Sequence, residues 1–233
     1  MYLREHTYTP PLTVTATSGI FPKVYGWMTA GLALTALAAL MTLSNQGLLN
    51  LVLGNRLVFY GLILGELGLV FAMSAAINRI SATAATMLFM LYSALNGVTF
   101  AGIFLIYTSS SIASTFMVAS GTFAAMSVYG YATKRDLTGW GSFLFMGLIG
   151  VIIASVVNIF LHSAMITWVT SYLGVFIFVG LTAYDTQKIR RIGQSGFADS
   201  DSRHKAAVLG ALTLYLDFIN LFFMLLRIMG NRR

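Results

Sequence analysis

Residues 140–161 read WGSFLFMGLIGVIIASVVNIFL, an apolar run with no charged side chain. About 20 apolar residues are enough to cross the hydrocarbon core of a bilayer as one helix. Similar runs recur along the chain, and dividing it at the polar breaks gives seven segments. They cover residues 21–43, 57–77, 84–107, 112–132, 140–161, 166–187 and 206–229. The pattern predicts an all-α, polytopic membrane protein with seven transmembrane helices.

The composition supports this fold class. Of the 233 residues, 58% are hydrophobic and only 9% are charged, with a mean hydropathy of +0.81. Soluble proteins carry about 25% charged residues, so this chain has too few to cover a water-facing surface. The absence of cysteine from the sequence excludes disulfides, thiol catalysis and thiolate metal sites.

The segments imply a simple domain organisation. We expect residues 1–20 to form a cytoplasmic N-terminal tail and residues 21–233 to form a single transmembrane bundle domain with a cytoplasmic loop at 188–205. No soluble catalytic domain is expected. The loops near residues 108–111 and 162–164 are so short that their flanking helices should be antiparallel neighbours. Gly61 and Gly65 form a GxxxG step, which favours close helix packing.

The basic residues predict an orientation. With the N-terminus in the cytoplasm, ten of the fourteen Lys and Arg residues lie inside, namely Arg4, Lys23, Arg79, Lys134, Arg135, Lys188, Arg190, Arg191, Arg203 and Lys205. This bias favours a cytoplasmic N-terminus and an external C-terminus. Basic residues at the C-terminus run against it, which leaves open a last segment that re-enters the membrane. The net charge of +7 follows from topology, so no nucleic-acid partner is expected.

Three acidic residues fall inside predicted membrane segments: Glu66, Asp185 and Asp217. A charged residue at the centre of a transmembrane helix costs about 2.5–3.5 kcal/mol on insertion scales, so such residues face the bundle interior and are candidates for function. Asp217 shares a helix face with Asn220, which indicates a polar pocket. Asp185 and Asp217 reach similar depths if the last helix begins in the cytoplasm, with Ser202 as its cap.

The sequence around these aspartates is similar to a known family. Residues 180–187 (GLTAYDTQ), 214–222 (LYLDFINLF) and 225–227 (LLR) closely resemble the Bax inhibitor-1 family, its bacterial YccA-like branch in particular. The resemblance implies a seven-helix bundle with the last helix central. It also implies a pair of aspartates that share a proton and govern a pH-sensitive cation leak, chiefly of calcium.

Individual residues can be matched to the family pattern. Asp185 and Asp217 match the aspartate pair, and Glu66 resembles an acidic position that some bacterial relatives carry in the second helix. Relatives also place an arginine one or two turns later that clamps the aspartates. The corresponding residue here, Arg79, is displaced toward the loop.

Elementary electrostatics favours the same switch. Two carboxylates about 3 Å apart in a low dielectric cannot both ionise cheaply, so they share one proton and titrate as a unit. When the proton leaves, repulsion separates the pair, and the exposed oxygens are ligands that Ca²⁺ prefers. The sequence therefore predicts a pH-sensitive cation (Ca²⁺) leak channel of the bacterial inner membrane. Its site comprises Asp185 and Asp217, which would also bind Ca²⁺ transiently, and a supporting pocket of Glu66, Tyr184, Asn220 and Arg79.

Other functions fit some of these residues. An adaptor that modulates a membrane protease or a stress-response complex would need no transport of its own, and purified protein would then not conduct. An intramembrane aspartyl protease also uses two aspartates, and Tyr184–Asp185 fits its Tyr-Asp motif, but Asp217 lacks the preceding Gly-x-Gly. We therefore expect no enzymatic activity and no cofactor beyond Ca²⁺ as a permeant ion. The expected partners are the lipid bilayer and another membrane protein.

Overall fold

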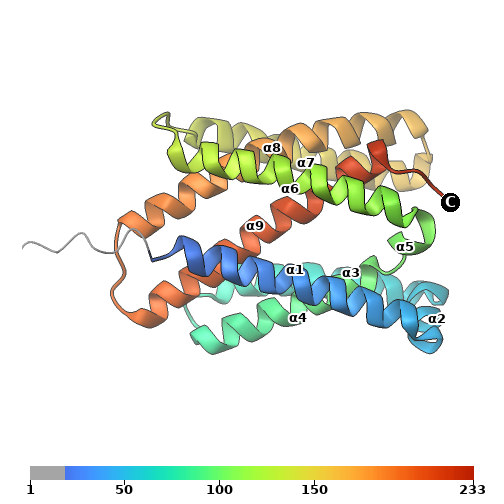
Figure 1. Ribbon diagram of the computed structural model, residues 1–233, viewed down its shortest axis with the longest axis horizontal. Coiled ribbons are helices and arrows are strands. Elements are labelled where there is room, and N and C mark those ends of the chain that lie inside the picture. Colours follow the sequence, from blue (N-terminus) through green and yellow to red (C-terminus); the bar gives the residue numbers. More distant parts are fainter. Residues whose placement is uncertain (1–18) are drawn as a thin grey trace, which may run out of the picture.

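The computed structural model describes residues 19–233, which form nine α-helices (Figure 1). Their bounds are α1 Phe21–Ser44, α2 Gln46–Gly54, α3 Arg56–Ala76, α4 Ala82–Phe100, α5 Ile103–Ile106, α6 Ser109–Ala132, α7 Thr138–Leu161, α8 Ala164–Gln194 and α9 Ser200–Met229. Within this part of the chain seven helical segments are long and apolar enough to cross a membrane, with α4 and α5 together forming one of them. The predicted seven-helix membrane architecture is confirmed.

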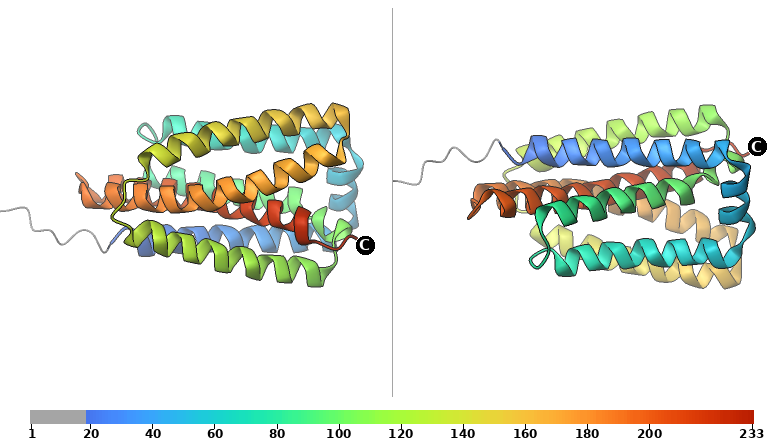
Figure 2. Two further views of the ribbon diagram at one scale, coloured as in Figure 1. Left: turned by 90° about the horizontal axis from the view of Figure 1, so that it is seen from above. Right: turned by 90° about the horizontal axis from the view of Figure 1, so that it is seen from below.

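The long helices form two layers separated by α9. The layer of α1, α3 and α4 lies on one side and that of α6, α7 and α8 on the other, with α9 running obliquely between them (Figures 1 and 2). The last helix packs against α1, α4, α6 and α8 and has the most buried membrane segment. It is therefore the central helix, as the family resemblance implies.

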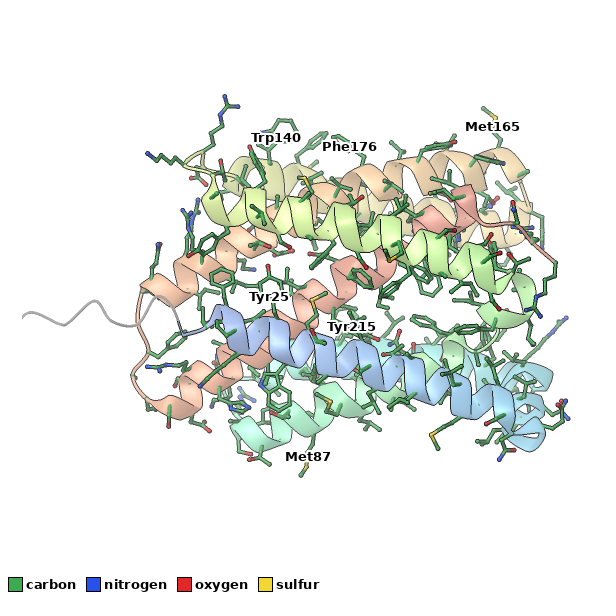
Figure 3. The ribbon with its side chains drawn as sticks, in the orientation of Figure 1. Tyr25, Met87, Trp140, Met165, Phe176 and Tyr215 are labelled. Atoms are coloured by element: carbon green, nitrogen blue, oxygen red, sulfur yellow. The ribbon has the colours of Figure 1, made fainter. Side chains whose placement is uncertain are left out.

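The core forms where α9 meets its neighbours, while the outer faces stay apolar. Tyr215 is fully buried, with its ring edge-on to Phe89 and its hydroxyl 2.7 Å from Thr35 Oγ1. Met87 and Met165 point outward, whereas Tyr215 lies inside (Figure 3). Outward apolar side chains are what a lipid-facing surface requires.

The segment between the last two spans differs from the prediction. The expected loop at 188–205 is largely helical, because α8 continues to Gln194 and α9 begins at Ser200. No proline interrupts residues 188–194, so the apolar run ends without ending the helix. The turn occurs at Gly196, whose φ of +80° favours glycine. The cap of α9 is Asp199, which accepts the N–H of Ser202 at 2.6 Å, and not Ser202 itself.

One helix pair was also predicted wrongly. The hairpin of α7 and α8 forms as expected, but α6 packs on α8 and α9 and is not a close neighbour of α4. A turn at Ala101–Gly102 and the short α5 carry the chain from one layer to the other before α6 begins. A short loop fixes neighbours only if the helix before it runs straight into that loop. Here the span breaks first.

The GxxxG step does not serve packing. Gly61 and Gly65 are exposed on α3, and no atom lies within 4 Å of a β-carbon placed at either position. α3 packs on α4 and α2 with its other face. Close approach occurs at Gly97, where a β-carbon would clash with the backbone of Thr35 in α1.

The two ends of the bundle contain different turns and different basic residues. Antiparallel alternation places the start of α1 and the turns 77–81, 133–137 and 195–199 at one end, here called the inner end. The C-terminus lies at the opposite, outer end (Figure 2). Arg56, Arg227, Arg232 and Arg233 belong to the outer end. Arg4 and most of the predicted tail lie outside the described residues, and the orientation of the bundle in the membrane stays a prediction.

Candidate functional site

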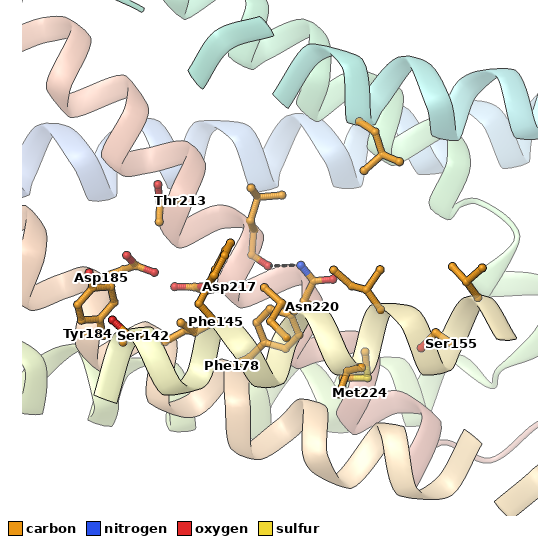
Figure 4. A pocket seen from close by; sticks show the side chains of 18 of the residues that line it. Ser142, Phe145, Ser155, Phe178, Tyr184, Asp185, Thr213, Asp217, Asn220 and Met224 are labelled. Carbon is orange, nitrogen blue, oxygen red and sulfur yellow. Dashed lines mark hydrogen bonds between the residues drawn. The ribbon is translucent and has the colours of Figure 1, made fainter. Parts of the chain in front are cut away.

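A groove of about 910 Å³ runs along α7, α8 and α9 (Figure 4), and Leu67 of α3 also lines it. Most of its lining is apolar. The polar exceptions come mainly from α8 and α9 and include Ser142, Tyr184, Asp185, Lys188, Thr213, Asp217, Asn220 and Arg227. Four predicted site residues, Asp185, Asp217, Tyr184 and Asn220, therefore line one groove.

Asp185 and Asp217 face each other across the interface of α8 and α9. The two residues are only 8% and 4% exposed. Their carboxyl groups point toward one another in Figure 4. Oδ2 of Asp217 is buried without a hydrogen-bond partner among the described residues. A carboxyl pair gains a donor only when one member carries a proton, so the geometry suits a singly protonated pair.

Among residues 19–233, no basic side chain forms an ion pair with either aspartate. The ion pairs in residues 19–233 are Arg191 with Asp136 and Lys205 with Asp201, both at the inner end. Lys188, one turn after Asp185, is exposed. It attracts that carboxylate electrostatically but does not form an ion pair with it. Burying two unpaired carboxylates is costly, which makes sharing a proton the cheaper state.

Glycines fix the position of Asp185. A β-carbon at Gly130 of α6 would clash with the carbonyl oxygen of Ala183, so α6 lies directly against the α8 backbone beside the aspartate. A β-carbon at Gly141 of α7 would clash with the ring of Tyr184. Both neighbours of α8 therefore approach it closely at this level. Asp185 thus lies on a helix that is packed tightly against α6 and α7.

Asp217 and Asn220 project from α9 into the same groove, one turn apart. The Asn220 amide donates to the carbonyl oxygen of Leu216 at 2.8 Å, the dashed line in Figure 4. The opposite face of α9 is anchored by Tyr215 and its contact with Thr35. This anchoring leaves α9 fixed against α1 while its groove face carries the polar residues.

Two predicted members of the pocket do not line the groove. Glu66 is buried on α3 and accepts a hydrogen bond from Thr99 Oγ1 of α4 at 2.5 Å. Arg79 is exposed in the turn after α3 and forms no ion pair with any described residue. The structure therefore separates Glu66 and Arg79 from the aspartates.

The sequence analysis did not assign five polar residues of the groove to the site, namely Ser142, Ser155, Lys188, Thr213 and Arg227. Lys188 is three residues after Asp185, and Thr213 is four residues before Asp217, so helical spacing from each aspartate would have indicated both. Arg227 marks the outer end of the groove. It was interpreted only through topology, because no acidic partner in the sequence pointed to it.

The groove can hold a cation only weakly. No group of three or more His, Cys, Asp or Glu residues is suitably placed for a metal in residues 19–233. Ca²⁺ takes six to eight oxygen ligands, and two carboxylates with nearby hydroxyl and amide oxygens supply only part of that set. An ion at this point would keep much of its water, as suits a permeant ion.

A hydrogen-bond network covers the inner end of α8. Gln187 is buried, donates to Arg135 O at 2.8 Å and accepts from Leu137 N at 3.0 Å. Arg191 binds Gln187 Oε1 at 2.7 Å and Asp136 at 2.6 Å. Hydrogen bonds from Arg191 and Thr138 hold the pKa of Asp136 well below its usual range. The turn between α6 and α7 is thus tied to α8 two residues beyond Asp185.

With this geometry in place, comparison with known proteins is informative. The family model described as "Inhibitor of apoptosis-promoting Bax1" matches residues 17–233. The chain belongs to the Bax inhibitor-1 family. It is 56% identical over 212 residues to the inner membrane protein YbhL of Escherichia coli, covering 91% of each chain. It is 50% identical to an uncharacterized protein of Borreliella burgdorferi, again over 91% of each chain.

A more distant relative matches over a longer range. The uncharacterized protein RP147 of Rickettsia prowazekii is 42% identical over 238 aligned positions, covering 97% of this chain and 98% of its own length. Similarity therefore extends through all the membrane helices. The protein is a multi-pass membrane protein of the Bax inhibitor-1 family.

Proposed function

We propose that the protein is a pH-responsive cation leak of the inner membrane, with Ca²⁺ among its permeant ions and the Asp185–Asp217 pair as its gate. The observation that carries the proposal is a pair of buried, facing carboxyl groups without a basic partner, set in a groove that reaches from Lys188 to Arg227. The inner-membrane location rests on the name of the Escherichia coli relative. No enzymatic step is part of the proposal.

The gate works through one shared proton. With the proton present, a carboxyl–carboxylate hydrogen bond holds α8 and α9 together at the aspartates, and the route is closed. When it leaves, two buried negative charges repel and the helices separate at this level. Because the protonated state is the closed one, flux should rise as pH rises.

The same two groups favour cations over anions. In the open state both carboxylates face the groove, and Asn220 and Thr213 add neutral oxygen atoms on the same side. A negatively charged constriction with oxygen donors selects cations. The incomplete ligand set lets the ion leave again.

An adaptor role is the second candidate, and one observation favours it. α8 and α9 extend beyond their apolar segments to Gln194 and Ser200, and these extensions carry Arg190, Arg191 and Arg203 at the inner end. Such a projecting basic hairpin could bind a partner protein. This role requires no conduction.

Reconstitution separates the two candidates. Purified protein in liposomes loaded with a Ca²⁺ dye should admit Ca²⁺ without any partner, at a rate that rises as the external pH is raised from about 5 to about 8. Protein-free liposomes and liposomes with a heat-unfolded sample give the background. If folded protein admits no cation at any pH in this range, the leak proposal fails and the adaptor role replaces it.

A further inference from the structure

A second, polar pocket of about 560 Å³ opens at the outer end of the bundle, between the α7–α8 turn and the end of α9. It is distinct from the aspartate site. The residues that give it its character are Asn158, His162, Thr167, Trp168, Arg227 and Arg232. The pocket is therefore lined by two arginines, several residues with hydrogen-bonding side chains and a tryptophan.

The pocket is basic, and no acidic residue of the described range 19–233 lines it. Every acidic residue between 19 and 233 lies elsewhere: Glu66 within α3, and Asp136, Asp185, Asp199, Asp201 and Asp217 from the inner end to the middle of the bundle. The side chains of Arg227 and Arg232 form neither an ion pair nor a hydrogen bond with any residue in that range. Arginine at the outer end also runs against the positive-inside bias, so these two residues need a separate explanation.

The C-terminal backbone holds Arg232 in place. Thr108 N donates to Asn231 O at 3.1 Å and Arg233 N to Ile106 O at 2.9 Å. Asn231 N donates to Ser111 Oγ at 2.8 Å, and Tyr107 and Arg232 form an antiparallel bridge. A chain terminus is usually frayed unless such bonds fix it. Arg232 is thus presented by an ordered backbone.

The basic pocket connects with the aspartate groove. Arg227 lines both cavities. From the level of Asn220 outward the groove is lined mainly by apolar side chains such as Val156, Ile159 and Met224. Trp168 is half exposed and stacks on Tyr172, at a ring-centroid distance of 5.7 Å, as residues at the membrane interface do. A cationic pocket thus lies next to the largely apolar outer part of the groove, with Arg227 between them.

We propose that this end of the protein binds an anionic phospholipid, with its phosphate on Arg227 and Arg232 and an acyl chain in the outer half of the groove. Arginine suits phosphate because its planar donors match the phosphate oxygens. A free phosphate ion would use the arginines but not the apolar outer part of the groove. The lipid uses both. The binding site does not depend on whether the groove conducts ions.

Trp168 is a suitable reporter for this site. The other tryptophans, Trp27 and Trp140, are near the inner end, so Trp27→Phe with Trp140→Phe leaves one fluorophore at the pocket. This protein is reconstituted in phosphatidylcholine containing a small fraction of phosphatidylglycerol brominated on its acyl chains. A matched sample contains brominated phosphatidylcholine. Because the lipids occupy both leaflets, the measurement does not depend on protein orientation.

Brominated phosphatidylglycerol should quench Trp168 fluorescence at a mole fraction at least about fivefold lower than the mole fraction of brominated phosphatidylcholine that gives the same quenching. One cationic residue near an anionic lipid raises the affinity by about that factor. Arg227→Gln with Arg232→Gln should remove the preference, and Arg232→Gln alone should reduce it. Arg56→Gln is the control, because Arg56 lies at the same end but outside the pocket. Circular dichroism and elution volume establish that each variant is folded.

Three outcomes would overturn the proposal. Equal quenching by the two lipids would mean that the pocket does not recognise a phosphate-bearing anion. A preference that survives loss of both arginines in folded protein would place recognition elsewhere. A third result concerns inorganic phosphate at millimolar concentration. If it abolished the preference for phosphatidylglycerol and also bound equally well to protein in liposomes without brominated lipid, the site would belong to a free anion and not to a lipid.

Discussion

At the scale of single residues, membrane acids differ by what surrounds them. Asp185 and Asp217 have each other, whereas Glu66 has the hydroxyl of Thr99. A carboxyl that accepts a hydroxyl hydrogen bond between two helices can be structural without being a gate. In the proposed mechanism the pH response therefore belongs to the aspartates, and Glu66 serves the packing of α3 on α4.

We expect Glu66→Gln to leave the pH midpoint of flux unchanged, within about 0.3 units, because glutamine still accepts the hydrogen bond from Thr99 and the aspartates are untouched. Ca²⁺ flux in liposomes measures the midpoint. Glu66→Leu tests the hydrogen bond separately, since it should lower the thermal midpoint of unfolding without shifting the pH midpoint. A displaced pH midpoint in the glutamine variant would make Glu66 part of the gate.

The aspartates and their polar neighbours could be predicted from sequence for a physical reason. A charge in an apolar run is expensive, so it stands out without any structure. Asn220 followed from its spacing to Asp217 on the same helix, and Tyr184 from its place directly before Asp185. Arg227 could not be assigned a site because its role depends on the α7–α8 turn, and no local pattern reveals which turn lies beside it.

At the scale of helices, close contact between α6 and α8 holds the aspartate level together. Gly130→Ala should place a methyl group against the Ala183 backbone and lower the free energy of unfolding by about 1–3 kcal/mol. Gly121→Ala on the same helix is the control, because no atom lies within 4 Å of its added carbon. Thermal unfolding in detergent measures both. Equal stability of the two variants would contradict the close packing at residue 130.

The helix boundaries show which features of the fold follow from the local sequence alone. Apolar runs fix where spans exist, and the predicted segments agree with the helices within about three residues, except that α8 ends at Gln194 instead of 187 and α9 begins at Ser200 instead of 206. They do not mark short helices, so α2 was missed although the Asn45 side chain caps its start and the Asn55 side chain caps α3 directly after it. The broken span of α4 and α5 likewise misdirected the prediction that α4 and α6 are neighbours. Helix pairing depends on contacts between distant residues.

At the scale of the whole molecule, seven spans place the two ends of the described chain on opposite sides of the membrane. From the distribution of basic residues we predict that residue 195 is cytoplasmic and residue 231 is external. Because the chain lacks cysteine, Ser195→Cys and Asn231→Cys each introduce one labelling site. An impermeant maleimide should label residue 231 in intact cells and residue 195 only after lysis. The reverse pattern would invert the topology.

The central claim is that one proton shared by Asp185 and Asp217 sets cation flux. The direct measurement is Ca²⁺ flux in liposomes from about pH 5 to about pH 8, with wild-type protein and Asp217→Asn side by side. A suitable control is Asp199→Asn. The backbone N–H of Ser202 holds the pKa of Asp199 below its usual range, so this residue stays ionised throughout, and asparagine caps a helix equally well.

Wild-type and Asp199→Asn flux should rise with pH, by up to about tenfold per pH unit below the midpoint. Asp217→Asn cannot lose the shared proton, so its flux should vary by less than about twofold, and adding Asp185→Asn should change little because the pair acts as one unit. If folded Asp217→Asn protein keeps the wild-type pH dependence, the aspartate pair is not the gate.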